Sequence, residues 1–518
     1  MRSRSRSTAR PSTACPSRRP SSPCPPPDVA LLPCINPVKS DACGGSRAGA
    51  SRSHTSRSPQ SESAIMRRFP LRALVGTAGL ALLAPVPVSA QGFTARESSA
   101  CLMSRAGAGV ANPCRDGSAI FTNPAGLMDL ESQVLSVGLT LYSPRGSFTS
   151  TRTGLAYDLE ERAQAVPTAF YGRRFGRAVA AGIGVYQPYR VQTEWPTDFA
   201  GRFLEYRSQI RNFNISPTVA VRPAKGVTLG AGLNVSWYTY QHRQRLDLSQ
   251  FPASPAATWG QLGVAAGTDF ADVGVTGDEV RLGFTVSAIV EPVEGVRLGG
   301  RYSSRQSVEM SGLGATVRPV PTGLVLTAGN PLGLPGGTPI DPLLQPLFQP
   351  GQTFSDQAAA TSFSIPDEFV VGLSIALGPR GQVLGEWQRT NWQQFESYDI
   401  TFERLPAQLG TRPANWFRQD AARFGAEYRV LDAVTARGGY AYLSGVNPDE
   451  SVDPFYPLAD RSQFSLGLGI RASSLLQVDL GWQHVQQGDR AGRVAPGSNT
   501  GLYEWQDNRF AATFAFAF

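Results

Sequence analysis

Residues 227–237 read Val-Thr-Leu-Gly-Ala-Gly-Leu-Asn-Val-Ser-Trp. Apolar side chains occupy every second position of this segment, and Thr, Gly, Asn or Ser lie between them. Because successive side chains of a β-strand point to opposite faces, this spacing predicts a strand with one apolar face and one polar or small face. The same alternation recurs at 135–142, 281–288, 369–377 and 464–470, which predicts an all-β fold.

Fourteen strands of this kind are predicted, and most reach the 9–11 residues with which a tilted strand crosses a bilayer. No run of 18 apolar residues follows Ala90, so a transmembrane helix is not expected. Residues 397–404 are interpreted either as part of a long loop or as an additional strand. The fourteen predicted strands are 133–143, 165–175, 178–189, 207–222, 227–243, 279–291, 295–310, 364–378, 381–394, 418–430, 433–443, 462–472, 475–487 and 505–518.

The connections between the predicted strands alternate in length. Short turns such as 223–226 are followed by long segments such as 244–278 and 311–363. This alternation is typical of an outer-membrane barrel, whose turns face the periplasm and whose loops face outward. A soluble β-sandwich, the alternative, gives no reason for it and leaves sheet edges exposed. Residues 133–518 are therefore predicted to form a transmembrane antiparallel β-barrel of about 14 strands.

The last strand places Phe510, Phe514, Phe516 and Phe518 on one face. Exposing such side chains to water costs about 1.5–3 kcal/mol each, whereas exposing them to lipid does not. Outer-membrane lipid is therefore the expected surrounding of the strand. A terminal phenylalanine on such a strand resembles the assembly signal of outer-membrane proteins, which implies that Phe518 is recognised by the barrel assembly machinery.

The net charge of +8 belongs to the N-terminal part of the chain. Residues 1–90 hold 13 Lys and Arg against 3 Asp and Glu, whereas residues 91–518 hold 35 against 37. A nucleic-acid partner therefore has no support in the near-neutral remainder of the chain.

Residues 1–65 are rich in Ser, Pro and Arg without apolar periodicity, which predicts disorder. Residues 66–90 begin with Met and two arginines, continue with a short apolar segment and end in Val-Ser-Ala. This order predicts a secretory signal peptide that is cleaved before Gln91. We interpret Met66 as the natural start and 1–65 as a mis-assigned extension; a genuine disordered tail is the alternative.

Residues 91–132 do not alternate. They contain a small-residue run at 106–111 and the sequence Asn123-Pro124-Ala125-Gly-Leu. Small residues allow short helices and turns to pack closely, and a 14-stranded barrel has a lumen too wide for its own side chains to fill. The segment is therefore predicted to be an N-terminal plug, or hatch, of short helices and turns.

These segments together resemble the FadL/TodX family of outer-membrane transporters for long-chain fatty acids and hydrocarbons. The Asn123-Pro124-Ala125 motif is similar to the characteristic plug motif of that family. Further blocks resemble the family in the same order along the chain: Gln91-Gly92-Phe93, Val185–Tyr189, Ile365-Pro366-Asp367 with Gly372, Glu386-Trp387 with Asn391-Trp392, Arg437–Tyr440 and Ala459-Asp460-Arg461.

Cys101 and Cys114 lie within the predicted plug, where the general family pattern does not require them. The exported chain meets an oxidising compartment in which two cysteines 13 positions apart can pair. A disulfide is therefore expected, and two free buried thiols are the alternative.

The resemblance implies passive uptake of a hydrophobic small molecule by a monomeric barrel. The loop 311–363 is unusually apolar, and exposed apolar patches often mark binding sites. We expect it to capture the ligand; the alternative, compatible with capture, is that it packs on neighbouring loops as a cap. The predicted capture residues are Leu324, Leu326, Leu332, Leu334, Leu343, Leu344, Leu347 and Phe348.

The implied exit route is either a lateral opening in the wall or a path past the plug. Pro188 cannot donate a ladder hydrogen bond, and we interpret it as the end of the third strand, with a kink near a wall opening as the alternative. An enzyme is not expected: after residue 90 only His242 and His484 are available as imidazole bases, and Gly-x-Ser-x-Gly is absent. No cofactor or metal site is predicted. A porin for small polar solutes is the alternative function.

Overall fold

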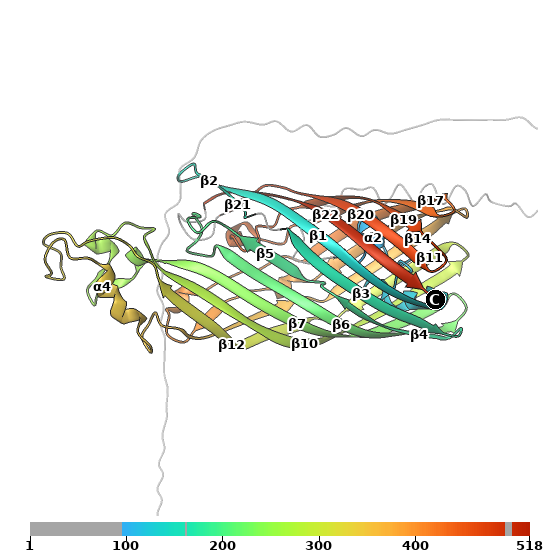
Figure 1. The fold of residues 1–518 in the computed structure, drawn as a ribbon, viewed down its shortest axis with the longest axis horizontal. Helices are drawn as coiled ribbons and strands as arrows, with labels where there is room; N and C mark the ends of the chain where they lie inside the picture. Colours follow the sequence, from blue (N-terminus) through green and yellow to red (C-terminus); the bar gives the residue numbers. More distant parts are fainter. Residues whose placement is uncertain (1–95, 161–162, 493–499) are drawn as a thin grey trace, which may run out of the picture. The chain divides into compact units, whose positions relative to one another are not determined.

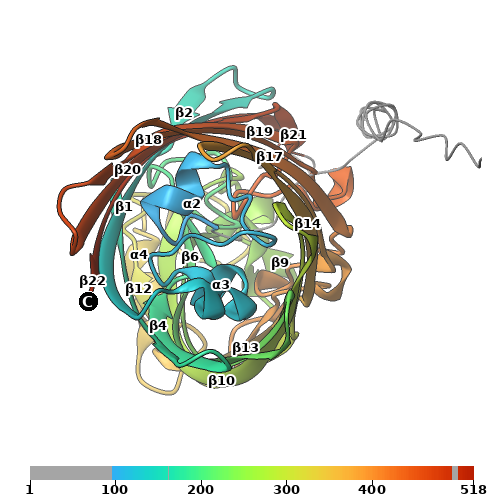
Figure 2. The ribbon, with the colours of Figure 1, turned by 90° about the vertical axis from the view of Figure 1, so that its right-hand side faces the viewer.

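The computed structural model describes residues 96–518 except 161–162 and 493–499. The segments predicted as extension and signal peptide lie outside this range, as does the beginning of the predicted plug. Within it, the chain forms a closed antiparallel β-barrel of 14 strands, as the sequence predicts. Closure is direct: β1 (Gln133–Ser150) pairs with β3 (Gln164–Phe175) on one side and with β22 (Gly501–Ala517) on the other. Figure 2 shows the barrel from the end that carries the short turns.

Four wall strands consist of two segments each, which share the position of one strand in the barrel. In order after β3, the wall contains β4 (Val179–Tyr186) with β5 (Arg190–Glu194), β6 (Arg207–Ala224), β7 (Val227–Asp247), β10 (Asp269–Val293), β11 (Val296–Ser303) with β12 (Gln306–Pro319), β14 (Glu368–Leu377) with β13 (Gln357–Ile365), β15 (Gly381–Thr390) with β16 (Ile400–Phe402), β17 (Gln419–Leu431), β18 (Val434–Leu443), β19 (Arg461–Arg471), β20 (Leu476–Gln487) and β22.

Short elements decorate the two ends and the interior of this wall. They are α2 (Ala100–Ser104), α3 (Ala119–Thr122) and η2 (Pro124–Asp129) before the barrel, and β2 (Ala156–Asp158), η3 (Leu248–Gln250), β8 (Pro252–Ser254), β9 (Ala257–Thr258), η4 (Gly260–Leu262), α4 (Asp341–Leu344), η5 (Gln345–Phe348), η6 (Trp392–Gln394), η7 (Ala407–Leu409), η8 (Asp449–Ser451) and β21 (Arg490–Gly492) in or beside the long loops. None of the described helices is long and apolar enough to cross a membrane.

The burial of the strand residues is the reverse of that in a soluble protein. On β1, Leu135, Val137 and Leu139 are more than 40% exposed, whereas Ser136 and Thr140 are buried toward the interior. The alternation seen in the sequence therefore places apolar side chains on the lipid-facing outside and polar or small ones inside.

Several strands are longer than predicted at the end where the long loops lie. β10 begins at Asp269 rather than 279, and β12 and β13 take residues 311–319 and 357–363 from the predicted loop 311–363. In these segments the alternation continues with the inner face apolar: Val273 and Val275 of β10 and Ala315 and Val317 of β12 are buried in one apolar cluster. Residues 397–404 contribute only β16, which pairs with β13, so they are not an additional wall strand.

Figure 1 places the two kinds of connection at opposite ends of the barrel. The C-terminus lies with the short turns, and α4 with the long loop 320–356 lies beyond the other end. The interior elements α2, α3 and η2 lie nearer to the short turns.

Candidate functional site

The plug elements α2, α3 and η2 lie inside the barrel (Figure 2), and nearly all of their residues are buried. Glycines on the surrounding strands allow the plug backbone to approach closely. A Cβ on Gly230 would collide with the backbone of Pro124 and Ala125, and a Cβ on Gly439 would collide with that of Arg105. The small residues on the inner strand faces therefore leave room for the plug.

Asn123, Pro124 and Ala125 join the plug to the wall. The side-chain amide of Asn123 donates to the carbonyl of Val110 at 2.6 Å and to that of Ala288 on β10 at 3.2 Å. Its side-chain oxygen accepts from the amide of Ala125 at 3.1 Å, which caps η2, and Pro124 takes the first position, where a missing N–H is harmless.

A buried ion-pair network holds the first described residues of the plug. Arg96 lies 3.0 Å from Glu368 on β14 and 3.0 Å from Glu386 on β15, and all three side chains are at most 4% exposed. The second oxygen of Glu386 accepts from the amides of Gly109 and Val110 at 3.0 and 2.9 Å. Arg301 on β11 contacts Glu368 as well and donates to the carbonyl of Phe121 at 2.7 Å.

A second charged group surrounds α2 on the side of the short turns. Arg105, just after α2, lies 3.7 Å from Glu427 on β17, which also lies 3.2 Å from Arg437 on β18. Arg437 reaches Asp479 on β20 at 2.5 Å. Burial lowers the pKa of Arg105, and the Glu427 carboxylate opposes this shift. The ion pairs of Arg96 and Arg105 thus tie the plug to the neighbouring wall strands β14, β15 and β17.

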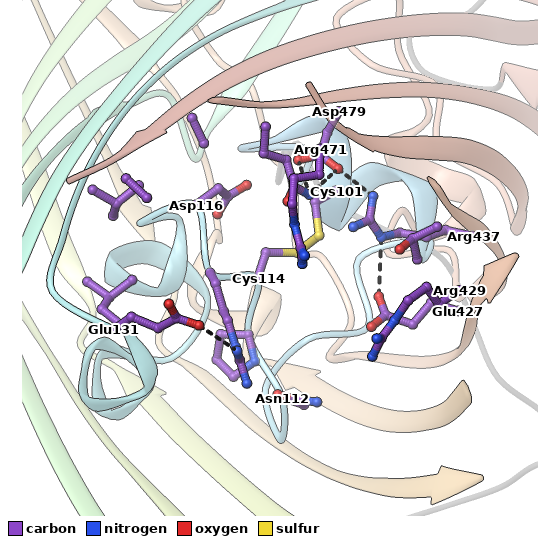
Figure 3. A pocket seen from close by; sticks show the side chains of 18 of the residues that line it. Cys101, Asn112, Cys114, Asp116, Glu131, Glu427, Arg429, Arg437, Arg471 and Asp479 are labelled. Carbon is purple, nitrogen blue, oxygen red and sulfur yellow. Dashed lines mark hydrogen bonds and ion pairs between the residues drawn. A yellow bond between two sulfur atoms is a disulfide. The ribbon is translucent and has the colours of Figure 1, made fainter. Parts of the chain in front are cut away.

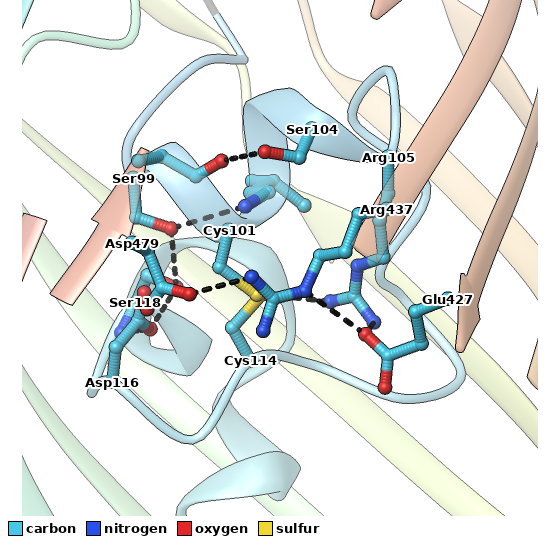
Figure 4. The surroundings of a disulfide bond; sticks show 12 residues. Ser99, Cys101, Ser104, Arg105, Cys114, Asp116, Ser118, Glu427, Arg437 and Asp479 are labelled. Carbon is cyan, nitrogen blue, oxygen red and sulfur yellow. Dashed lines mark hydrogen bonds and ion pairs between the residues drawn. A yellow bond between two sulfur atoms is a disulfide. The ribbon is translucent and has the colours of Figure 1, made fainter. Parts of the chain in front are cut away.

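Cys101 of α2 and Cys114 are joined by a disulfide (Figure 4), with an S–S distance of 2.07 Å and a Cα–Cα distance of 6.4 Å. The bond closes the loop that contains the small-residue run 106–111. Arg105 donates to the sulfur of Cys114 at 2.8 Å from within this loop.

A cavity of about 790 Å³ opens beneath the plug at the end of the short turns (Figure 3). Its walls include the disulfide, Arg105 and Asn112 from the plug, and Arg429 and Arg471 from the barrel. The plug therefore lies between this cavity and the outer part of the lumen, the part nearer to the long loops.

The predicted capture residues lie over the opposite end, in a large apolar cluster. Leu326 and Leu344 are buried in it, and Leu324, Leu332, Leu343, Leu347 and Phe348 pack against it half-buried. Phe348 lies 6.3 Å from Phe270 and 5.5 Å from Phe354, measured between ring centroids. Leu334 is exposed. The loop thus packs on its neighbours as a cap, the arrangement that the sequence left open beside capture.

The third wall strand is interrupted at residues 187–189. β4 pairs with β6 up to Tyr186, and the chain rejoins β6 as β5 from Arg190 onward. β4 thus ends just before Pro188, in line with the favoured interpretation, but the wall strand resumes as β5. Because proline lacks an N–H, the ladder skips this position, and the side chain of Asn212 accepts from the amide of Tyr189 at 2.8 Å instead.

The interruption weakens the wall on the other side of β4. The β3–β4 ladder stops at the pair Ala169–Val185, whereas β5 pairs with β6. Beyond that pair, the Arg190 side chain bridges to β3 by donating to Gln164 at 2.7 Å. A side-chain contact thus replaces backbone pairing at this point of the wall.

Comparison with known proteins agrees with this architecture. The family described as outer membrane protein transport protein (OMPP1/FadL/TodX) matches residues 81–502. The chain belongs to the OMPP1/FadL/TodX family. The FadL/TodX resemblance seen in the sequence is therefore confirmed, and so is the outer-membrane location.

Individual relatives of this FadL/TodX family protein are distant in sequence. A 47 kDa outer membrane protein of Pasteurella multocida is 24% identical over 419 residues, which cover 77% of this chain and 88% of the relative. The crystal structure of a Pseudomonas aeruginosa FadL homologue shares the fold with a TM-score of 0.70 and 19% identity, covering 83% of this chain and all of the other. That of the P. putida toluene transporter TodX has a TM-score of 0.58 and 14% identity, covering 83% and 99%.

The outer part of the lumen in this FadL/TodX family protein also holds a buried polar group that sequence reasoning missed. His242 on β7 lies 3.2 Å from Glu205 and 2.9 Å from Gln244. Nearby, Tyr398 donates to Asp453 of the loop 444–460, and burial raises the pKa of Asp453 to about 7. In the sequence, the only sign of this group is that His242 and Gln244 stand two residues apart on β7 and therefore share its inward face.

Proposed function

We propose that this protein takes up hydrophobic small molecules, long-chain fatty acids or hydrocarbons, by passive diffusion down a gradient. The main support is the position of the apolar cap formed by residues 320–356 and its neighbours, over the outer end of a barrel whose lumen holds a plug. The name of the P. putida relative, a toluene transporter, agrees with an apolar cargo.

Capture is the first step. The half-buried side chains Leu324, Leu332, Leu343, Leu347 and Phe348 border an aromatic and aliphatic cluster that an apolar ligand enters without exposing polar groups. Each methylene transferred from water contributes about 0.8 kcal/mol, so a long alkyl chain is retained by burial alone.

Release occurs through the wall rather than past the plug. Passing the plug would break the buried ion pairs of Arg96 and the hydrogen bonds of Asn123, whereas the wall at Pro188 lacks ladder pairing between β3 and β5. An apolar ligand that leaves there enters the lipid directly. The Arg190–Gln164 contact is the side-chain pair that such an opening would separate.

The protein acts as a monomer in outer-membrane lipid, and the barrel assembly machinery inserts it by recognising Phe518. This residue follows β22 directly with an exposed side chain, and its backbone bonds to Gln133 of β1 across the closure of the barrel. A general porin would need a wide aqueous path, whereas here the buried elements α2, α3 and η2 occupy the lumen.

Uptake by a strain that lacks the endogenous transporter tests the proposal. Wild-type protein should restore uptake of a radiolabelled fatty acid or toluene, and Phe348→Asp together with Leu344→Asp should abolish it. Leu334→Asp, which changes an exposed side chain of the same loop, should retain uptake. Failure of wild type with every apolar substrate, together with large steady currents in planar bilayers, would favour the porin instead.

A further inference from the structure

The Cys101–Cys114 disulfide forms part of the wall of the cavity beneath the plug. Both cysteines line this cavity of about 790 Å³, which opens at the end of the short turns (Figure 3). Cavities of roughly 300–1,000 Å³ hold small-molecule ligands. A small reagent from the periplasm can therefore approach the bond, although the two cysteines are only 5% and 6% exposed.

The two sulfur atoms of the bond differ in their hydrogen bonding. The guanidinium of Arg105 donates to Sγ of Cys114 at 2.8 Å, whereas no described residue donates to Sγ of Cys101. A cationic donor stabilises a thiolate, and thiol–disulfide exchange is faster when the departing thiolate is the more stable one. Cys114 is therefore the leaving sulfur, and Cys101 is the sulfur that an incoming thiolate attacks.

Asp116 is a second charged side chain beside the bond. A carboxylate oxygen of Asp116 lies within 4.8 Å of both sulfur atoms, and the same side chain accepts from the backbone amide of Ser118 at 3.0 Å. Its negative charge disfavours a thiolate on either sulfur, whereas the guanidinium of Arg105 offsets this charge at Cys114. The asymmetry between the two sulfur atoms therefore comes from Arg105, which Figure 4 shows together with Asp116 around the disulfide.

The bond closes a loop that carries plug-to-wall contacts. Within this loop, the amides of Gly109 and Val110 donate to Glu386 at 3.0 and 2.9 Å. The helix α2, on the other side of the bond, is anchored separately, because the amide of Ala100 donates to Thr513 of β22 at 2.9 Å. Breaking the bond therefore frees the loop from α2 while α2 stays on the wall.

We propose that the Cys101–Cys114 bond is a thiol–disulfide exchange site for small thiols that enter the cavity from the periplasm. The thiolate of such a molecule forms a bond to Sγ of Cys101, and the electron pair of the broken S–S bond leaves on Cys114 as a thiolate beside Arg105. A second molecule of the thiol then attacks the sulfur of the first, and Cys101 departs as a thiolate. The two protons of the small thiols end on the two cysteines, so the protein disulfide is reduced and the small thiol is oxidised to its own disulfide.

This exchange makes the fastening of the plug reversible. In the oxidising compartment the resting form is the disulfide, and the small-molecule disulfide that the exchange produces restores it by the reverse reaction. Reduction leaves α2 in place and lets the loop that binds Glu386 move. The site is independent of what the barrel transports and of the route by which the cargo leaves.

Trapping of the mixed disulfide on the purified barrel tests this site, with glutathione as the probe. The reaction is stopped with acid, free thiols are blocked with N-ethylmaleimide, and trypsin, which cleaves after Arg96, Arg105 and Arg115, releases the two cysteines in separate peptides. Wild type should carry glutathione on Cys101 and the maleimide on Cys114 about tenfold or more over the reverse, since a hydrogen bond to a charged group contributes at least one such factor.

Two variants separate the hydrogen bond of Arg105 from the general charge of the cavity. Arg105→Gln should lose most of the preference for Cys101, and fragment ions of the uncleaved peptide 97–115 locate the adduct in this variant. Arg471→Gln is the matched control, because this exposed arginine lines the same cavity but forms no ion pair in the described part of the chain. It should keep the preference.

Several results would overturn the proposal. Wild type with neither glutathione nor maleimide on the two cysteines would show that the bond is closed to small thiols. An equal or reversed distribution in wild type would refute the attack on Cys101, and both results count even if the Arg105→Gln barrel fails to assemble. Retention of the preference in Arg105→Gln, or its loss in Arg471→Gln, would exclude the Arg105 hydrogen bond as its cause.

Discussion

Arg96 of the plug and Glu386 of β15 form a buried ion pair, 3.0 Å apart, with side chains 2% and 1% exposed. They are 290 positions apart in the sequence. Glu386 also accepts hydrogen bonds from Gly109 and Val110, so one wall carboxylate fixes two separate parts of the plug.

Replacing Arg96 with Met should loosen the plug. The substitution removes the cation that joins Glu368 and Glu386 to the plug and leaves them only the wall arginines Arg301 and Arg423. Removal of one member of a buried pair costs about 3–5 kcal/mol. Faster hydrogen exchange over residues 96–130, with unchanged exchange in the barrel strands, is the expected result. Arg115→Met is the control, because the 3.9 Å pair of Arg115 with Glu131 is exposed and such pairs contribute about 0–1 kcal/mol. Equal exchange in the two variants would contradict the assigned role of Arg96.

Loss of the Cys101–Cys114 bond should destabilise the same plug. By the chain-entropy model, a loop of this size contributes roughly 3 kcal/mol. Replacing both cysteines with Ser should speed hydrogen exchange in residues 100–118 to the rate that wild type shows in reductant. Reductant should leave the double variant unchanged. Alkylation of unreduced wild type, detected as a mass shift, would show free thiols and refute the bond.

The sequence was sufficient for the lipid-facing wall, because alternation is a local property that residues such as Leu135 and Val137 report without knowledge of their neighbours. The strand segments beyond the lipid were underestimated because the alternation reverses there. At 269–278 the apolar residues Ala271, Val273 and Val275 face inward into the apolar cluster of the cap, so the outward apolar pattern does not continue.

The tertiary partners could not be predicted in this way. Nothing in the segment around Arg96 specifies Glu368 or Glu386 as its partners. The alternation on their strands predicts that these two acids face the lumen, but it does not predict which residue of the plug they contact. The packing of Leu344 likewise depends on how distant loops meet. Asn123 was recognised by its motif, but its bond to Ala288 required the structure.

The outer cap should become less stable as the pH rises. Asp453 is buried beside Tyr398, Glu205 and Arg412, and burial followed by the Glu205 carboxylate raises its pKa to about 7. An acid that binds its proton more tightly in the folded chain than in the unfolded one, where the pKa is about 3.9, contributes full stability below pH ~4. This contribution is lost as the pH rises through 7.

Limited proteolysis of the loop 444–460 measures this effect. Cleavage of wild type should be faster at pH 8 than at pH 5, and Asp453→Asn should keep the slow rate at both values. Asp449→Asn alters an exposed carboxylate of the same loop and should behave as wild type. A pH dependence that persists in Asp453→Asn would assign the effect to another group.

Gly230 on β7 should be essential for seating the plug. A Cβ at this position meets the backbone of Pro124 and Ala125, which cannot move aside as a flexible side chain does. Gly230→Ala should therefore displace η2, at a cost of about 1–3 kcal/mol for overpacking, and raise the steady current in planar bilayers. Gly385→Ala on β15 is the matched control, because a Cβ there meets no atom within 4 Å. If Gly230→Ala conducts no more than Gly385→Ala, close contact between η2 and β7 is not what holds the lumen shut, and the ion pairs and hydrogen bonds between the plug and the wall must do so.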